Sequence, residues 1–106
     1  MNIIRMSWHD YGIDKNTYHK IIEYIKQLST EELGELMEIC NDVDSLVSTW
    51  LFESITKNKS YDNLTGWHLI PVGRTDFYGK RRQVINELYK RKLKGTETIN
   101  VNDTIK

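Results

Sequence analysis

Apolar residues recur at steps of three and four along most of this chain, and this spacing is the strongest constraint on its fold. The first repeat runs through Tyr18, Ile21, Ile22, Ile25 and Leu28. Steps of three and four place side chains on one face of an α-helix. No segment alternates apolar and polar residues convincingly, as a half-buried β-strand does. The sequence therefore predicts an all-α fold.

Capping residues divide the chain into about five predicted helices, which form a small bundle. Asp14 or Asn16 can cap the first helix. Ser29 and Glu32 fit a capping box for the second, whose apolar face runs from Leu33 to Cys40. The third begins near residue 42 or 44 and ends at residues 57–59, a short fourth covers residues 60–65, and the last runs from about residue 74 to residue 93.

The third predicted helix has the widest apolar stripe, so we expect it to be the central core helix. Its stripe contains Val43, Leu46, Val47, Trp50, Leu51 and Ile55, and we expect Trp50 to be buried. Tyr61 and Leu64 of the short fourth helix are expected to face inward, and Gly66 to end that helix. In the last helix, Phe77, Arg81, Val84, Ile85 and Leu88 follow helical spacing.

The chain has 106 residues, which suits a single domain. We expect a helical domain over residues 1–95, with an ordered N-terminal arm over residues 1–13, and a flexible tail over residues 96–106. The mean hydropathy is −0.58, and no apolar run approaches the ~20 residues of a membrane span, so no membrane association is expected. The single cysteine, Cys40, excludes a disulfide framework and indicates a reducing, cytoplasmic location.

The net charge is zero overall, but it is unevenly distributed. Residues 1–56 contain four basic and ten acidic residues, whereas residues 57–106 contain eleven basic and five acidic residues. The segment from Arg74 to Lys94 alone has eight basic and two acidic residues, and it holds four of the five arginines. Arginine matches phosphates and guanine edges in a way that lysine does not. This segment therefore predicts a surface suited to nucleic acid, although a solvated helix face is the simpler alternative.

The order of a core helix, a short helix, a connector and a basic helix is that of a helix-turn-helix unit, here at about residues 44–93. The second helix of such a unit enters the major groove with its N-terminal side chains. Arg74, Thr75, Tyr78 and Arg82 would then probe the groove of double-stranded DNA, and Lys80 and Arg81 would reach phosphates or pack with their stems. One such unit makes few contacts, so a homodimer is plausible.

Three stretches resemble known phage proteins: Ser60-Tyr61-Asp62-Asn63-Leu64, then Ile70-Pro71, then the segment from Arg74 to Arg82. With Ser7 to Gly12 they resemble small proteins of Firmicute phages and prophages. More distantly, about residues 44–93 resemble the C-terminal helix-turn-helix of ArpU-type and RinA-type phage late-transcription regulators. The resemblance implies a transcriptional regulator in the cytoplasm of a host bacterial cell. One departure is that Pro71 to Gly73 lengthens the turn before the basic helix, which bears on how that helix would dock.

A second hypothesis is a protein–protein module, such as a phage-encoded inhibitor of a host system (an anti-CRISPR or another counter-defence protein). The partner surface would be the acidic face formed by Glu31, Glu35 and Glu38, together with Trp67 in the connector, residues 66–73. The acidic face could imitate nucleic acid on a host protein. A solvated helix face is the alternative for the three glutamates.

The sequence predicts no catalytic residues, no metal site and no cofactor. His9, His19 and His68 do not stand at metal-ligand spacing with Cys40. Cys40 lies on the apolar face of a predicted helix, where a lone cysteine is usually an inert small hydrophobic residue. The glycines match no phosphate-binding loop. We therefore expect a binding protein rather than an enzyme.

Overall fold

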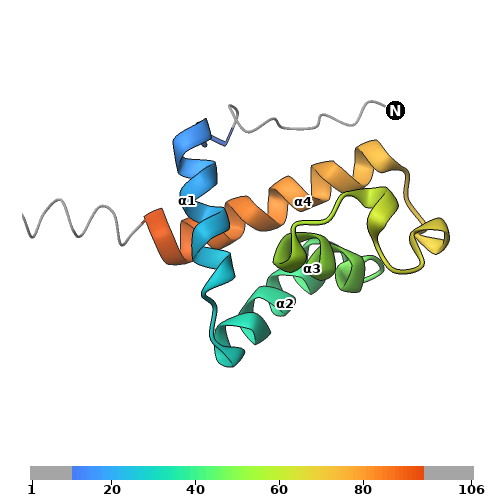
Figure 1. Cartoon of the computed structure of the whole chain (residues 1–106), viewed down its shortest axis with the longest axis horizontal. Coiled ribbons are helices and arrows are strands. Elements are labelled where there is room, and N and C mark those ends of the chain that lie inside the picture. Colours follow the sequence, from blue (N-terminus) through green and yellow to red (C-terminus); the bar gives the residue numbers. More distant parts are fainter. Residues whose placement is uncertain (1–10, 95–106) are drawn as a thin grey trace, which may run out of the picture.

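The computed structural model describes residues 11–94, and this part of the chain is helical without any strand. The predicted tail at residues 96–106 and most of the predicted N-terminal arm lie outside the described residues. The elements are α1 (Lys15–Lys26), α2 (Thr30–Asp44), α3 (Ser48–Lys57), the 3-10 helices η1 (Tyr61–Asn63) and η2 (Trp67–Leu69), α4 (Arg74–Leu88), and the π-helical segment η3 (Tyr89–Lys94), as Figure 1 shows.

The predicted starts of the first two helices are confirmed. Of the two possible caps for α1, Asp14 is the N-cap, and its Oδ1 accepts a hydrogen bond from the Thr17 N–H at 2.7 Å. At α2 both bonds of the capping box form: Ser29 Oγ accepts from the Glu32 N–H, and Glu32 Oε1 accepts from the Ser29 N–H. Such caps satisfy backbone donors that have no partner within the helix.

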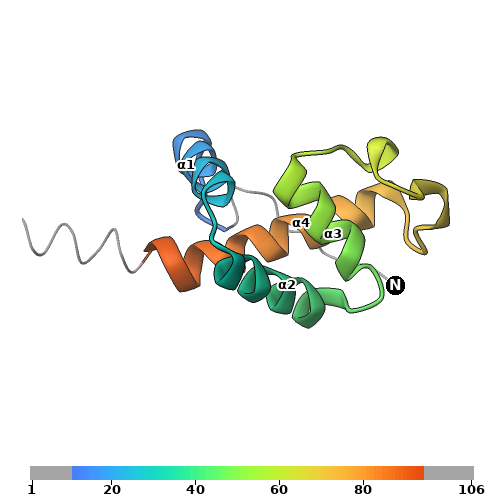
Figure 2. The same cartoon turned by 60° about the horizontal axis from the view of Figure 1, so that its bottom comes forward.

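The core forms where α4 packs against both α2 and α3, while α1 crosses the C-terminal part of α4 (Figures 1 and 2). Phe77 of α4 is the largest fully buried side chain. α4 therefore occupies the central position that we expected for the third helix. Its buried apolar residues are Phe77, Val84, Ile85 and Leu88, which meet Leu36, Ile39 and Cys40 of α2, Leu51 and Ile55 of α3, and Ile21 and Ile25 of α1.

The predicted boundary between the second and third helices is wrong. α2 continues past Cys40, where its predicted apolar face ends, to Asp44, and α3 begins at Ser48 rather than near residue 42 or 44. The turn is set by Asp44, whose Oδ1 accepts a hydrogen bond from the Leu46 N–H at 3.0 Å. Short acidic side chains commonly compete with helical bonds in this way. Leu46 therefore lies in a turn, and 67% of its surface is exposed.

Trp50 is only partly buried, which corrects the expectation that it is a core residue. Its ring packs against the core, and its Nε1–H donates to the Thr65 carbonyl at 2.9 Å. An indole has one polar atom that needs a partner, so it is well suited to the edge of a core. The fully buried residues of this stripe are Val47, Leu51 and Ile55.

The short helix expected at residues 60–65 is the 3-10 helix η1, and a second 3-10 helix, η2, lies in the predicted connector. The turn begins at Asn58, which adopts the left-handed conformation that often ends a helix. Tyr61 and Leu64 are buried as predicted. Gly66 has a φ of 65° and precedes η2, a conformation that glycine adopts without strain. The Tyr61 hydroxyl donates to the Val72 carbonyl at 2.7 Å and so ties the connector together.

Leu46 and Leu51 both belong to the predicted stripe of the third helix, and substituting each of them tests the observed boundary of α3. Leu51 is fully buried, whereas Leu46 is largely exposed. Replacing Leu51 with alanine should lower the free energy of unfolding by about 2–5 kcal/mol, because it leaves a cavity. Leu46→Ala, the matched control, should stay within about 0.5 kcal/mol of the parent. Urea denaturation measures both, and equal losses would contradict the assigned boundary of α3.

Candidate functional site

The predicted DNA-reading residues lie at the N-terminal half of α4, and two of them are exposed. Thr75 is open to solvent. Arg74 is 56% exposed, and its Nη2 donates to Asp62 Oδ1. Its guanidinium also lies over the Tyr61 ring, 5.2 Å from the centroid. The bond to Asp62 raises the pKa of Arg74. Arg82 is partly buried.

Tyr78 and Lys80 make contacts within the fold. The Tyr78 hydroxyl accepts a hydrogen bond from the Tyr61 N–H at 2.8 Å and so holds η1 against α4. Lys80 forms an ion pair with Asp44, with its Nζ 3.1 Å from Oδ2. Both side chains therefore support the packing of α4 against the rest of the domain.

Arg81 is buried, which favours packing within the fold, one of its two predicted roles, over contact with a DNA phosphate. Only 9% of its surface is exposed, because it shares the helix face of Phe77 and Ile85. Its Nε–H donates to Ser54 Oγ at 2.9 Å. Two longer bonds reach the Tyr18 hydroxyl at 3.4 Å and Asn58 Oδ1 at 3.5 Å.

The acidic and basic halves of the sequence meet where α2 lies beside α4. Lysine and arginine side chains of α4 and η3 pair with carboxylates of α2 in three places. The N···O distances are 3.1 Å for Lys80–Asp44, 3.8 Å for Arg91–Asp42 and 2.8 Å for Lys92–Glu35. Within η3, Lys90 also pairs with Glu87 of α4 at 3.7 Å. Much of the basic charge is thus neutralised inside the domain.

These pairs shift the pKa values of their members in the directions expected for ion pairs. The hydrogen bond from Lys80 is the main cause that lowers the pKa of Asp44, with the Leu46 N–H acting in the same direction. The bond to Glu35 raises the pKa of Lys92. Both shifts favour the charged forms in the folded state.

The predicted partner surface divides into two separate parts. Glu31, Glu35 and Glu38 are exposed on α2, and Glu35 is paired with Lys92. Trp67 lies in the connector, 41% exposed, with its ring edge-on to Tyr61 at 6.1 Å between centroids.

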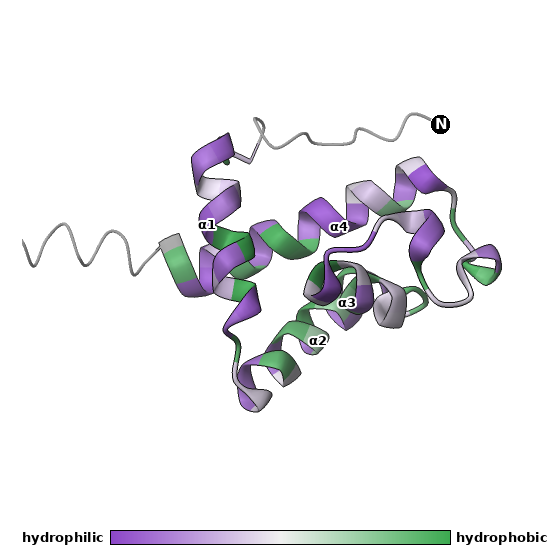
Figure 3. Ribbon diagram, in the orientation of Figure 1, coloured by the Kyte–Doolittle hydropathy of each residue, from purple (hydrophilic) through white to green (hydrophobic). Residues whose placement is uncertain are grey.

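Sequence reasoning missed two apolar residues that accompany Trp67. Leu69 of η2 is 68% exposed and Leu46 is 67% exposed. The α2–α3 turn and the connector lie at the same end of the molecule in Figures 1 and 2, and Figure 3 colours parts of both as hydrophobic. We call Leu46, Trp67 and Leu69 the apolar end. The periodic pattern around Leu46 concealed its exposure, because Leu46 falls in register with Val43 and Val47.

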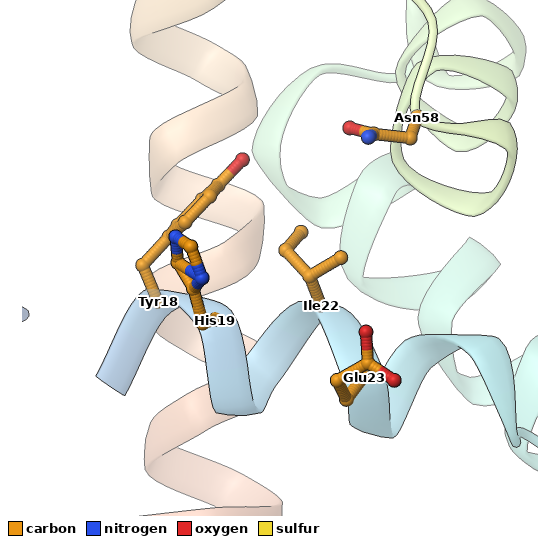
Figure 4. Close-up of a pocket in the computed structure, with 5 residues that line it drawn as sticks. All are labelled: Tyr18, His19, Ile22, Glu23 and Asn58. Atoms are coloured by element: carbon orange, nitrogen blue, oxygen red, sulfur yellow. The ribbon is translucent and has the colours of Figure 1, made fainter. Parts of the chain in front are cut away.

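Two adjoining hollows lie between α1, the residues after α3, and α4. The first has a volume of about 240 Å³ and is lined by Tyr18, His19, Ile22, Glu23 and Asn58. In Figure 4, Tyr18 and Ile22 project from α1 toward the segment that carries Asn58. The second hollow, of about 280 Å³, shares Tyr18 and Asn58 and is also lined by Lys59, Ser60, Tyr78 and Arg81.

Within residues 11–94 no three His, Cys, Asp or Glu residues are placed to hold a metal ion. In the same range no helix has the length and apolarity to cross a membrane. Burial raises the pKa of the Cys40 thiol to about 12. A thiol with such a pKa is a poor nucleophile at neutral pH.

Comparison of the sequence with protein-family models, with curated proteins and with solved structures found no significant match.

The ion pair at Asp44 should make stability depend on pH. A lowered carboxyl pKa stabilises the fold above the pKa of the unfolded state, about 4, and this contribution is lost as the pH falls through the folded-state pKa. Asp44→Asn keeps the Oδ1 acceptor for Leu46 but removes the charge. It should cost up to about 1 kcal/mol at pH 7 and less at pH 3, as measured by urea denaturation.

Asp42→Asn is the matched control, because Asp42 is 69% exposed and its ion pair is longer, at 3.8 Å. We expect it to change stability little at either pH. A loss for Asp44→Asn that is as large at pH 3 as at pH 7 would show that the charge of Asp44 contributes nothing.

Proposed function

We propose that this chain is a non-catalytic protein-binding module that contacts its partner through the apolar end. The observation that carries this proposal is the exposure of Leu46 in the α2–α3 turn and of Trp67 and Leu69 in the connector, two segments that lie at the same end of the molecule (Figures 1 and 2). Single exposed apolar residues are common on protein surfaces, whereas a group of large ones is typical of an interaction site. Tryptophan is also enriched among the residues that dominate binding energy.

The apolar end is held by the fold, which favours binding. The Trp50 Nε1–H bonds to the Thr65 carbonyl and joins the connector to α3. The Tyr61 hydroxyl bonds to the Val72 carbonyl, and the Tyr61 ring lies against Trp67. A surface that is already ordered loses less conformational entropy on association. The partner, which we take to be the host target of a phage-encoded inhibitor, would offer an apolar pocket to Trp67 and Leu69.

Binding of double-stranded DNA is the second candidate function. Arg74 and Thr75 are exposed, and at 100° per residue Tyr78 and Arg82 share their side of α4. Two observations weigh against a helix-turn-helix at residues 44–93. Residues 64–73 separate η1, which stands where the short helix of the unit was expected, from α4, whereas such units have turns of about 3–4 residues. Lys80, Arg91 and Lys92 are also paired with α2.

A substitution that introduces one charge at the apolar end tests the proposal. Leu69→Asp places a carboxylate where we expect an apolar contact, so it should weaken binding to a purified partner by roughly 100-fold. The partner would first be captured from host cells with the parent chain, and its affinity then measured by calorimetry. Thr30→Asp is the control, because residue 30 is exposed in the first turn of α2, where an acidic side chain is favourable.

Unchanged affinity of the Leu69→Asp variant would contradict the proposal. So would duplex-DNA binding at physiological salt that Arg74→Ala abolishes and Leu69→Asp preserves, because that pattern belongs to the second candidate. Sedimentation of the parent chain and of the Leu69→Asp variant tests whether the apolar end forms a homodimer. A homodimer that Leu69→Asp dissociates would assign the apolar end to a second copy of the chain and not to a host protein.

A further inference from the structure

Arg81 carries a buried charge that no carboxylate among residues 11–94 pairs with. It is not part of any ion pair made by the described residues, and its three hydrogen-bond acceptors are all neutral groups. A guanidinium group has five N–H donors, so two N–H groups have no acceptor among the described residues. Burying a charge without an opposite charge is costly. An anion bound next to this guanidinium would therefore stabilise its buried charge.

Arg81 lines the hollow of about 280 Å³ together with Tyr18 and Asn58, which accept hydrogen bonds from its guanidinium. Its other polar groups can donate as well. The Tyr78 hydroxyl accepts from the Tyr61 N–H, which leaves its own hydrogen for another acceptor. Ser60 Oγ accepts from Asn63 Nδ2 at 2.9 Å and likewise keeps its hydrogen. Lys59, also in the lining, is already paired with Glu53 at 3.3 Å, so Arg81 supplies the unbalanced charge.

We propose that this hollow binds a phosphate group. A guanidinium fork with nearby hydroxyl donors matches the oxygens of a tetrahedral oxyanion. The adjoining hollow, lined by Tyr18, His19 and Ile22, has room for an organic group attached to that phosphate (Figure 4). The inference is independent of the proposed function, because the apolar end lies in the α2–α3 turn and the connector.

The experiment is an NMR titration of the full ¹⁵N-labelled chain with inorganic phosphate at constant ionic strength. Saturable shifts should appear at the Arg81 Nε–H and at the amides of residues 58–60. Arg81→Met should weaken phosphate binding roughly tenfold or more. Arg91→Met removes the same charge from an exposed site and should leave binding unchanged. Phenyl phosphate is titrated in parallel.

Tighter binding of phenyl phosphate would assign the ligand to phosphate monoesters, and equal binding would assign it to free phosphate. Shifts that do not saturate, that match those in sodium chloride, or that lie away from the hollow would overturn the proposal. If the Arg81→Met variant does not fold, Ser60→Ala serves instead. Residue 60 is exposed, so this change should preserve the fold, and it should weaken phosphate binding measurably. Unaltered binding would also overturn the proposal.

Discussion

The packing of α4 against α2 and α3 is the constraint on which the rest of this structure depends. Phe77, Val84 and Ile85 must be buried, which fixes how α4 is rotated about its axis. With that rotation, Lys80 meets Asp44, and farther along Lys92 meets Glu35. The hydrophobic core thus determines which charges meet, and the ion pairs themselves contribute little energy.

Charge pairing within the fold changes how the uneven charge distribution of the sequence is interpreted. An acidic first half and a basic second half suggest two outward-facing surfaces of opposite sign. In the folded domain, α2 and α4 lie side by side and their charges meet at Asp42 and Arg91 as well as at the two pairs above. This favours an interaction through apolar residues over one through a basic helix. The resemblance to phage regulators remains a hypothesis about origin, since no comparison supports or opposes it.

The sequence predicted the features that depend on local spacing. Helices α1 and α2 began where their caps indicated, because Asp14 and Ser29 act on backbone groups within three residues. The burial of Arg81 could also be read from spacing, because it stands four residues after Phe77 and four before Ile85. Its chemical type added contact with a phosphate as the alternative to packing.

Features that depend on tertiary contacts could not be predicted from the sequence. Leu46 has the spacing of a core residue, but the bond from its own N–H to Asp44 turns the chain and exposes it. The contact that ties Trp50 to Thr65 spans fifteen residues. The hollow over Arg81 combines α1, α4 and the residues after α3. Only the folded chain brings such groups together.

The basic charge of α4 and η3 is largely neutralised by carboxylates within the fold, and removing those carboxylates is the most direct test of this neutralisation. We would measure affinity for a generic DNA duplex against salt concentration, for the parent chain and for a variant with Glu35→Gln, Asp42→Asn and Asp44→Asn. We predict weak binding by the parent at physiological salt. We also predict tighter binding by the variant, with a salt slope steeper by about one unit for each base that gains a phosphate contact. Tight binding by the parent, with no change in the variant, would contradict the neutralisation of this charge within the fold.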